Sequence, residues 1–441
     1  MKEAKTSPDM SPGLRRVMER ARRNPHERQY ALAYLIDVEA LRRAYHRLRK
    51  DAAVGVDGVT KEVYGQNLEE NLQDLHARMK AMKYRHQPIL RVHIPKDRNR
   101  TRPIGISALE DKIVQDSLRE ILEAIYEQGF LDCSHGFRPG RKAHDALKVL
   151  NQTVRRGEAN VILEADVESF FDSLDRPKLK EMLQERIADK SFLRLIGKCL
   201  RVGVLEGEAF SEPEEGTVQG SVLSPILGNI YLHNVLDRWF EQEVKPRLKG
   251  KATLIRFADD FVICFEHRED AERVMGVLGK RFDRFNLRLQ ADKTRLIEFR
   301  RPPRSQTKGK GPGSFDFLGF TVYWRRGHRG GGWHMSWKTR KARLRRATHN
   351  IHDLCRRQRH RSIPEQHAAL KRRIQGHFNY FGVNGNTRSL VILAYYVRRA
   401  WYKWLNRRSQ RSRLNWKRFR DLLRDFPLPY PRVYVNLWAS P

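Results

Sequence analysis

Hydrophobic positions in the first third of the chain recur with two periods, which predict helices and a strand. Apolar side chains lie at helical spacing over residues 32–49, among several arginines, and again over residues 68–82. Both segments are therefore expected to form amphipathic helices. The apolar run ILRVHIP that follows predicts a strand, whereas the polar residues 1–30 predict a loosely ordered, basic lead-in.

In the middle of the chain the pattern alternates strands with helices. The run Val161–Leu163 predicts a buried strand, followed by a helix that starts near Pro177. The stretch TLIRFADDFVICF, residues 253–265, predicts a β-hairpin, because two apolar runs flank a short Ala-Asp-Asp step. A helix over residues 271–282 and a strand pair around LRLQADKTRLIEF complete the order β-α-β-β-α-β. This order predicts a ferredoxin-like sheet with its first strand beside the hairpin.

The last quarter of the chain predicts three more helices, each with one apolar stripe. The stripes run from Leu344 to Leu354, from Ile374 to Phe381 and from Leu390 to Leu405, and Thr387 is the expected N-cap of the third helix. A long apolar helix is also expected over residues 223–244. Helices and strands occur in separate groups as well as in alternation, so the fold class is expected to be α+β.

Charge identifies the kind of partner. The formal net charge is +35, which favours a polyanion over a small metabolite. An anionic membrane is the alternative, but no apolar run approaches the roughly 18 residues that a spanning helix needs. The first residues also lack the apolar core of a signal peptide. We therefore expect a soluble, cytoplasmic protein, in the bacterial cytosol or nucleoid, with no membrane partner.

Two adjacent acids, Asp259 and Asp260, stand at the tip of the predicted hairpin between two phenylalanines. Like charges so close together repel each other, which favours a cation beside them. Asp166 follows the strand expected beside the hairpin, so it should face Asp259. A hard cation such as Mg²⁺ accepts carboxylate and phosphate oxygens together and would suit these three acids. The alternative is a solvated turn, since Asp is common in turns.

Basic and aromatic side chains interleave after Thr387, where acids are nearly absent. A solvated charged surface would mix both signs, whereas this composition suits phosphate contacts and base stacking on structured RNA. The cations expected to bind RNA are Arg398, Arg399, Lys403, Arg407 and Arg408. The four cysteines are scattered without a C-x-x-C pair, so neither a zinc knuckle nor a disulfide framework is predicted.

Sequence blocks in a fixed order give the chain a resemblance to a known family. They are GVDGVT near Asp57, IPK with TRPIGI, HGFRPGRKAHDA from His135, the Asp166 block, VQGSVLSPILGNIYL from Val218, FADD, ADKT at Lys293 and FDFLGF from Phe315. In this order they resemble group II intron reverse transcriptases and maturases. Two positions depart from the family, which usually has Tyr at Phe257 and Pro-Gln-Gly-Gly where this chain has Val218 to Ser221.

The resemblance implies roles for residues around the acids. Lys96 and Arg102 would hold the triphosphate of an incoming deoxynucleotide, although a solvated surface loop is the alternative. Phe171 would exclude a 2′-hydroxyl by steric clash, unless it belongs to the core like Phe170. Gln219 would touch the nucleotide and the template pair. Lys293 would be the general acid for the leaving pyrophosphate, or else an ordinary surface lysine.

The resemblance also implies a right-hand polymerase followed by a helical maturase domain. The expected parts are a lead-in over residues 1–30, fingers over 31–150, a palm over 151–325, a thumb over 326–385 and the maturase domain, called domain X, over 386–441. Many relatives carry a carboxyl-terminal HNH endonuclease, and none is expected here.

We therefore expect an RNA-directed DNA polymerase that uses two Mg²⁺ ions held by Asp166, Asp259 and Asp260. Its expected partners are the intron RNA, an RNA template with a DNA primer, deoxynucleoside triphosphates and target DNA. One alternative is a splicing maturase with little polymerase activity. Another is a reverse transcriptase of a different lineage, such as a host-defence enzyme.

Overall fold

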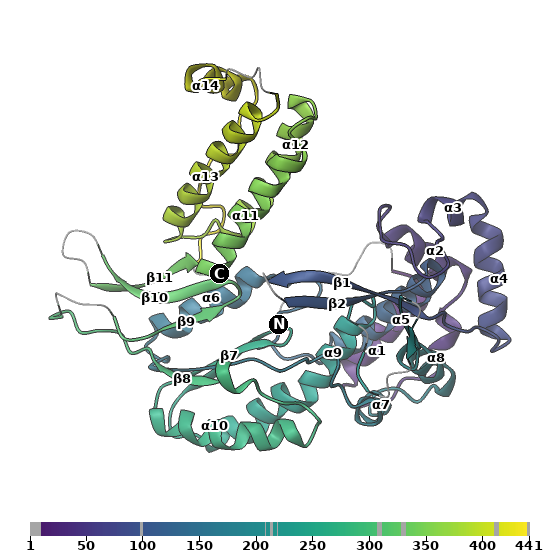
Figure 1. Cartoon of the computed structure of the whole chain (residues 1–441). Coiled ribbons are helices and arrows are strands. Elements are labelled where there is room, and N and C mark those ends of the chain that lie inside the picture. The colour runs from purple at the N-terminus through teal and green to yellow at the C-terminus, as the bar shows by residue number, and fades with distance from the viewer. Residues whose placement is uncertain are drawn as a thin grey trace.

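The structure is a computed structural model that describes residues 10–97, 100–207, 209–211, 215–217, 219–306, 311–327, 332–409 and 414–438. Within these residues helices combine with three sheets (Figure 1), as an α+β fold requires. No helix in this part of the chain is both long and apolar enough to cross a membrane.

The central sheet has the predicted ferredoxin-like order. Its strands are antiparallel and lie in the order β6 (Ala252–Phe257), β7 (Asp260–Phe265), β3 (Val161–Ala165) and β8 (Arg295–Glu298). The two crossover helices are α7 (Arg176–Gln184), which Asp175 caps, and α10 (Arg268–Asp283). The first strand thus lies beside the hairpin, as the alternation of strands and helices predicts.

The strand pair expected around LRLQADKTRLIEF is only partly present. Leu289 makes a single bridge to Val167, a 3₁₀ turn occupies Ala291–Lys293, and only β8 pairs regularly with β3. The turn forms because the backbone N–H groups of Lys293 and Thr294 both bond back to the carbonyl of Gln290. The prediction of two strands here was wrong for the first of them.

Helices gather around the amino-terminal half. They are α1 (Pro12–Arg23), α2 (Val38–Arg47), α3 (Lys61–Gln66), α4 (Leu68–Lys80), α5 (Leu109–Tyr126) and α6 (Ala143–Arg155). The expectation of a loose lead-in over residues 1–30 was wrong for α1, which packs on α5 and buries Leu14 and Ala21. Ser11 caps this helix and Pro12 occupies its first turn, which are strong start signals in a polar segment. The helix expected from residue 32 begins only at Val38, after Asp37 as N-cap.

A long hairpin replaces the basic loop expected between Lys96 and Arg102. Strand β1 (Ile89–Asp97) pairs with β2 (Arg100–Ile106), and Ile94 faces Arg102 across the pair. Two short strands, β4 (Val204–Glu206) and β5 (Ala209–Ser211), extend the sheet beyond β1. Helix α8 (Lys190–Leu200) lies between α7 and β4 in the chain. Arg102 therefore projects from a strand of a sheet.

The long apolar helix expected over residues 223–244 is continuous but changes its hydrogen bonding. Helix α9 (Ser224–Leu232) is followed by π-helical turns over His233–Asp237 and Trp239–Val244, and then by a 3₁₀ turn at Lys245–Arg247. π-Helical turns often mark functional positions. The first of these turns carries Asp237 into the core.

The carboxyl-terminal part combines a small sheet with a helical bundle. Strands β9 (Ser314–Phe317), β10 (Phe320–Arg326) and β11 (Trp333–Thr339) form the sheet. Helices α11 (Lys341–Arg357), α12 (Ile363–Phe381) and α13 (Thr387–Asn406) stand above it with α14 (Trp416–Asp425) at their far end (Figure 1). The N-cap of α13 is Asn386, not Thr387, and the Asn386 side chain makes no capping bond but donates to the Thr339 hydroxyl and the carbonyl of Phe381.

Helices α11, α12 and α13 share one hydrophobic cluster, which includes Ile351, Phe378 and Trp401. The boundary predicted between thumb and maturase domain, at residues 385 and 386, falls between two helices of this bundle. The division into these two domains remains a prediction.

The last described residues return from the bundle to the palm. Val383 bridges Val435, and the Asn151 side chain of α6 donates to the carbonyl of Leu437 at 2.9 Å. Leu437 is buried in the cluster that also covers one face of the central sheet. We call residues 434–438 the closing segment. It connects the far end of the bundle to the sheet that carries the hairpin.

Candidate active site

The acidic hairpin has a two-residue turn. Phe257 pairs with Asp260, which leaves Ala258 and Asp259 at the tip, and Ala258 has a positive φ of 56°. Gly136, from the HGFRPGR segment, packs against this tip, where a Cβ would lie 2.2 Å from the Ala258 nitrogen. Only glycine permits so close an approach. The segment thus supports the hairpin directly.

The HGFRPGR segment is itself fixed in place by its buried side chains. The backbone N–H of His135 donates to the carbonyl of Arg256, and Arg138 pairs with Glu127 at 2.7 Å. Burial lowers the pKa of His135 to about 4, so this imidazole is neutral near pH 7. The segment is a rigid support for the neighbouring β6 strand.

A buried arginine holds the hairpin from behind. Arg256 donates to both carboxylate oxygens of Asp237, at 2.7 and 2.6 Å, and to the carbonyl of Ala258 at 2.9 Å. It also donates to Asn229 and Ser134. Burial alone would raise the pKa of Asp237, but the Arg256 guanidinium holds it below its usual range. The sequence predictions missed this network, although an arginine inside the apolar run TLIRF was its signal.

The three predicted acids lie close enough to influence one another. Burial and the neighbouring Asp166 raise the pKa of Asp259. Asp260 keeps solvent-exposed surface, yet the dense protein around it, together with Asp259 and Asp166, raises its pKa to about 6. Lys293 forms an ion pair with Asp166. Each of these observations indicates that the hairpin tip favours positive charge.

The three acids supply carboxylate oxygens, which are the ligands that a hard cation prefers. One of them, Asp166, already pairs with the ammonium group of Lys293. Among the described residues, however, no three His, Cys, Asp or Glu side chains are gathered tightly enough to form a ready-made metal site. Lys293 occupies one carboxylate oxygen of Asp166. Binding of a metal through this Asp166 oxygen would require the lysine to move.

Two of the predicted nucleotide-binding residues touch each other. Arg102 donates from Nε to the side-chain oxygen of Gln219 at 2.7 Å, and the Gly105 N–H donates to the Gln219 carbonyl at 2.7 Å. Gly220 has a φ of +113°, and a Cβ there would lie 2.5 Å from the Gly105 oxygen. Strand β2 and the segment before α9 are therefore locked together. The Lys96 side chain and all of Val218 lie outside the described residues.

The two adjacent phenylalanines differ in burial. Phe170 is buried and Phe171 is half-buried, and both line a narrow hollow that Ala258 at the hairpin tip also borders. Phe137 lines the same hollow and is 50% exposed, with a φ of 55°. An exposed phenylalanine with strained backbone beside the acids is a candidate contact that the sequence predictions missed.

The predicted RNA-binding cations are all exposed on the surface of the bundle. They are Arg398, Arg399, Lys403, Arg407 and Arg408. Exposed aromatic rings lie among them, at Tyr395, Tyr396 and Trp416. Arg399 stacks over Tyr395, while Lys403 and Arg407 both lie over Trp404. The cations and aromatic rings that alternate along the sequence therefore also lie next to one another on the surface of the bundle.

Comparisons with known proteins find similarity to a group II intron-encoded protein and to a second bacterial protein. The group II intron-encoded protein LtrA of Lactococcus lactis subsp. cremoris is 36% identical over 210 residues, which cover 47% of this chain and 35% of LtrA. The protein YkfC of Escherichia coli (strain K12) is 33% identical over 277 residues, which cover 55% of this chain and 71% of YkfC. The chain thus spans about a third of the length of LtrA and most of YkfC.

Among solved structures, telomerase from Candida albicans in complex with a fragment of telomeric RNA has a TM-score of 0.47 at 15% identity, over 83% of this chain and 64% of that one. This likeness is too slight to support a further conclusion. A sequence profile described as "Reverse transcriptase (RNA-dependent DNA polymerase)" matches residues 94–322. Because this match spans just over half of the chain, the protein belongs to the reverse transcriptase family.

Proposed function

We propose that the protein is the reverse transcriptase of a group II intron, and that it also binds the intron RNA to assist splicing and retrohoming. The observation that carries the catalytic half is that Asp166, Asp259 and Asp260 lie close enough to act on one another's pKa, and that Arg102 lies close enough to counteract part of the rise in the pKa of Asp259. These groups would bring acid ligands and a triphosphate-binding cation to one place. Similarity to LtrA supports the intron half of the proposal.

In this proposal Asp166, Asp259 and Asp260 hold Mg²⁺, which when bound activates the primer hydroxyl and neutralises the triphosphate. The protein's own groups do the rest. Arg102, held by Gln219, binds phosphate oxygens and so positions the deoxynucleotide. Lys293 would exchange its Asp166 partner for the triphosphate, and its ammonium would then donate a proton to the leaving pyrophosphate.

The structure suits this exchange of partners for Lys293. Its side chain is 49% exposed, and that of Asp166 is 23% exposed. A lysine with so much exposed surface can move away from Asp166 at little cost in burial, because exposed ion pairs contribute little to stability. Asp166 would thereby become available for a metal.

Primer extension on an RNA template tests the proposal. The wild-type protein should extend a DNA primer with deoxynucleotides when Mg²⁺ is present, and Asp259→Asn should reduce the rate by orders of magnitude. Asp283→Asn is the matched control, because Asp283 is an exposed acid at the end of α10 and does not belong to the hairpin. Normal extension by Asp259→Asn would rule out the assignment of the acids.

RNA binding tests the intron half separately. Filter binding of the surrounding intron RNA, together with a splicing assay, should give tight binding and faster splicing for both the wild type and Asp259→Asn. If the protein extends primers but neither binds that RNA nor promotes its splicing, it is a reverse transcriptase of another lineage.

A further inference from the structure

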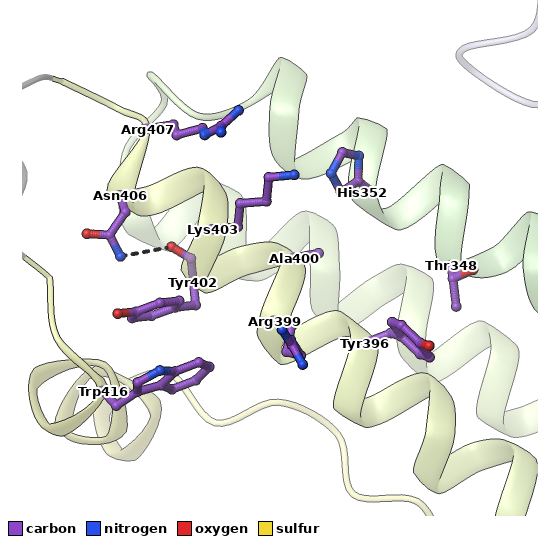
Figure 2. A pocket seen from close by; sticks show the side chains of 10 residues that line it. All are labelled: Thr348, His352, Tyr396, Arg399, Ala400, Tyr402, Lys403, Asn406, Arg407 and Trp416. Carbon is purple, nitrogen blue, oxygen red and sulfur yellow. Dashed lines mark hydrogen bonds between the residues drawn. The ribbon is translucent and has the colours of Figure 1, made fainter.

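A cavity of about 590 Å³ opens in the bundle between α11, α13 and α14. Figure 2 shows side chains from all three helices converging on it. Its size is within the range of small-molecule and nucleotide sites. The cavity lies far along the chain from the acidic hairpin, and the chemistry proposed above does not use it.

The cavity is lined by cations without acids. Arg399, Lys403 and Arg407 are among its ten lining residues, none of which is Asp or Glu. No ion pair joins any of these three cations to an acid in the described part of the chain. Burial, and then the nearby Lys403, lower the pKa of His352, so this imidazole adds no charge at neutral pH. The site should therefore bind an anion.

Aromatic rings form the remaining wall. Tyr402 and Trp416 are stacked with their centroids 4.0 Å apart, and Trp416 remains 49% exposed (Figure 2). Tyr396 also faces the cavity and is 52% exposed. Exposed rings beside cations that have no acidic partner are typical of surfaces that bind unstacked bases.

Three of the neutral polar side chains of the lining, Thr348, Tyr402 and Asn406, already have hydrogen-bond partners. The Tyr402 hydroxyl donates to the carbonyl of Leu414, and the Thr348 hydroxyl to that of Arg345. The Asn406 amide donates to the Tyr402 carbonyl and accepts from the Leu414 N–H. Because these three side chains bond to the protein, and the cations and exposed rings dominate the rest of the lining, the site should depend mainly on charge and stacking and show little base preference.

We propose that this cavity holds one unstacked nucleotide of a single-stranded RNA segment, with its phosphate between Arg399, Lys403 and Arg407 and its base against Tyr396. The inference rests on the proposed RNA-binding function and specifies its contact. Of the five predicted RNA-binding cations, these three line the cavity, while Arg398 and Arg408 do not. Those two would contact phosphates elsewhere on the same strand.

The test measures binding of a labelled, short oligoadenylate to the full chain by fluorescence anisotropy over a salt series. Tyr396→Ala should weaken binding about tenfold, whereas Tyr396→Phe, which keeps the ring, should bind like the wild type. Arg399→Gln should weaken binding and reduce the slope of log affinity against log salt by about 0.7. Arg372→Gln is the control, because it removes an equal charge from an exposed position on α12 outside the cavity.

Three outcomes would overturn the inference. Equal losses of affinity for Arg399→Gln and Arg372→Gln would show that only overall charge matters, and normal binding by Tyr396→Ala would exclude stacking. Competition by adenosine monophosphate as strong as that by the oligoadenylate would assign the cavity to a free nucleotide. Thermal melting should show that Tyr396→Ala folds normally.

Failure of this inference can be separated from failure of the proposed function. If the cavity variants bind oligoadenylate normally while the wild type still extends primers and binds intron RNA, only the cavity assignment falls. If the wild type does neither, the proposed function falls.

Discussion

Arg256 and Asp237 form a two-point ion pair in which neither side chain reaches solvent. The pair joins β6 to the π-helical turn after α9, and the same guanidinium holds the carbonyl of Ala258 at the hairpin tip. The position of the acids therefore depends on a charge pair behind them. Removing one partner of such a pair is costly, because the other charge stays buried without compensation.

Asp237→Asn should accordingly lower the free energy of unfolding by about 3–5 kcal/mol. Urea unfolding of the full chain, followed by circular dichroism, measures the change. Glu269→Gln is the control, because it breaks the exposed pair with Lys249 and should change the stability far less. Similar losses of stability for both variants would mean that the buried pair contributes no more to the free energy of unfolding than the exposed pair does.

Selection of the sugar depends on whether Phe171 faces the nucleotide. Phe171→Ala would enlarge the hollow beside the Ala258 turn, so it should raise incorporation of ribonucleotides relative to deoxynucleotides. Primer extension with each nucleotide class measures the ratio, and Phe192→Leu, a change to a buried ring outside the hollow, serves as a control for core packing. An unchanged ratio for Phe171→Ala would place this ring in the core.

Two buried groups near α5 give opposite dependences of stability on pH. Burial raises the pKa of Asp111 to about 7, although it accepts hydrogen bonds from Tyr84 and the Gln87 N–H. Burial lowers the pKa of His86 to about 4. Between pH 4 and 6.5 the folded state therefore holds the Asp111 proton more tightly than the unfolded state and the His86 proton less tightly. The two contributions nearly cancel there.

Replacing one of these two residues should expose the pH dependence of stability that the other contributes. Relative to the wild type, His86→Gln should lose stability as pH rises from 4 to 6.5, by roughly 3 kcal/mol in total. Asp111→Asn should gain relative stability as pH rises from 4 to 7. Urea unfolding at several pH values measures both differences, and pH-independent differences would contradict these pKa shifts.

The cations of the bundle predict how intron RNA binding responds to salt. Replacing Arg398, Arg399, Lys403, Arg407 and Arg408 together with Gln should weaken binding. The slope of log affinity against log salt should fall by about 0.7–0.9 for each RNA phosphate that these side chains no longer neutralise. Extension of a generic primer should be affected less, because the acids lie in the palm. An unchanged slope would mean that these cations are merely solvated.

Local patterns predicted the elements around the acids well. Strand β3, the β6–β7 hairpin and α10 each carry a clear apolar period, and the order of these elements determines the central sheet. The Arg256–Asp237 pair could not be predicted this way, because its partners belong to separate elements and meet only in the packed core. Helix α1 was missed for a related reason, since its narrow apolar stripe becomes a core surface only against α5.

The turn at Ala291–Lys293 shows another limit. An alternating apolar pattern favours a strand, but it does not specify whether a neighbouring strand is within reach of every residue. Here the backbone bonds back on itself at Gln290, and the chain thereby directs Lys293 toward Asp166. Lys293, which the family resemblance places near the leaving pyrophosphate, thus lies directly after the segment where the strand prediction failed.

The closing segment determines how an RNA held on the bundle would be presented to the hairpin. Because β11 leads directly into α11 and residues 434–438 return to α6, the bundle is attached to the palm at both ends. An RNA strand bound as proposed would then be tethered to the palm. Its effective concentration at the hairpin would depend on the fixed spacing between bundle and palm rather than on diffusion from solution. Two attachments would also make that spacing reproducible from one turnover to the next.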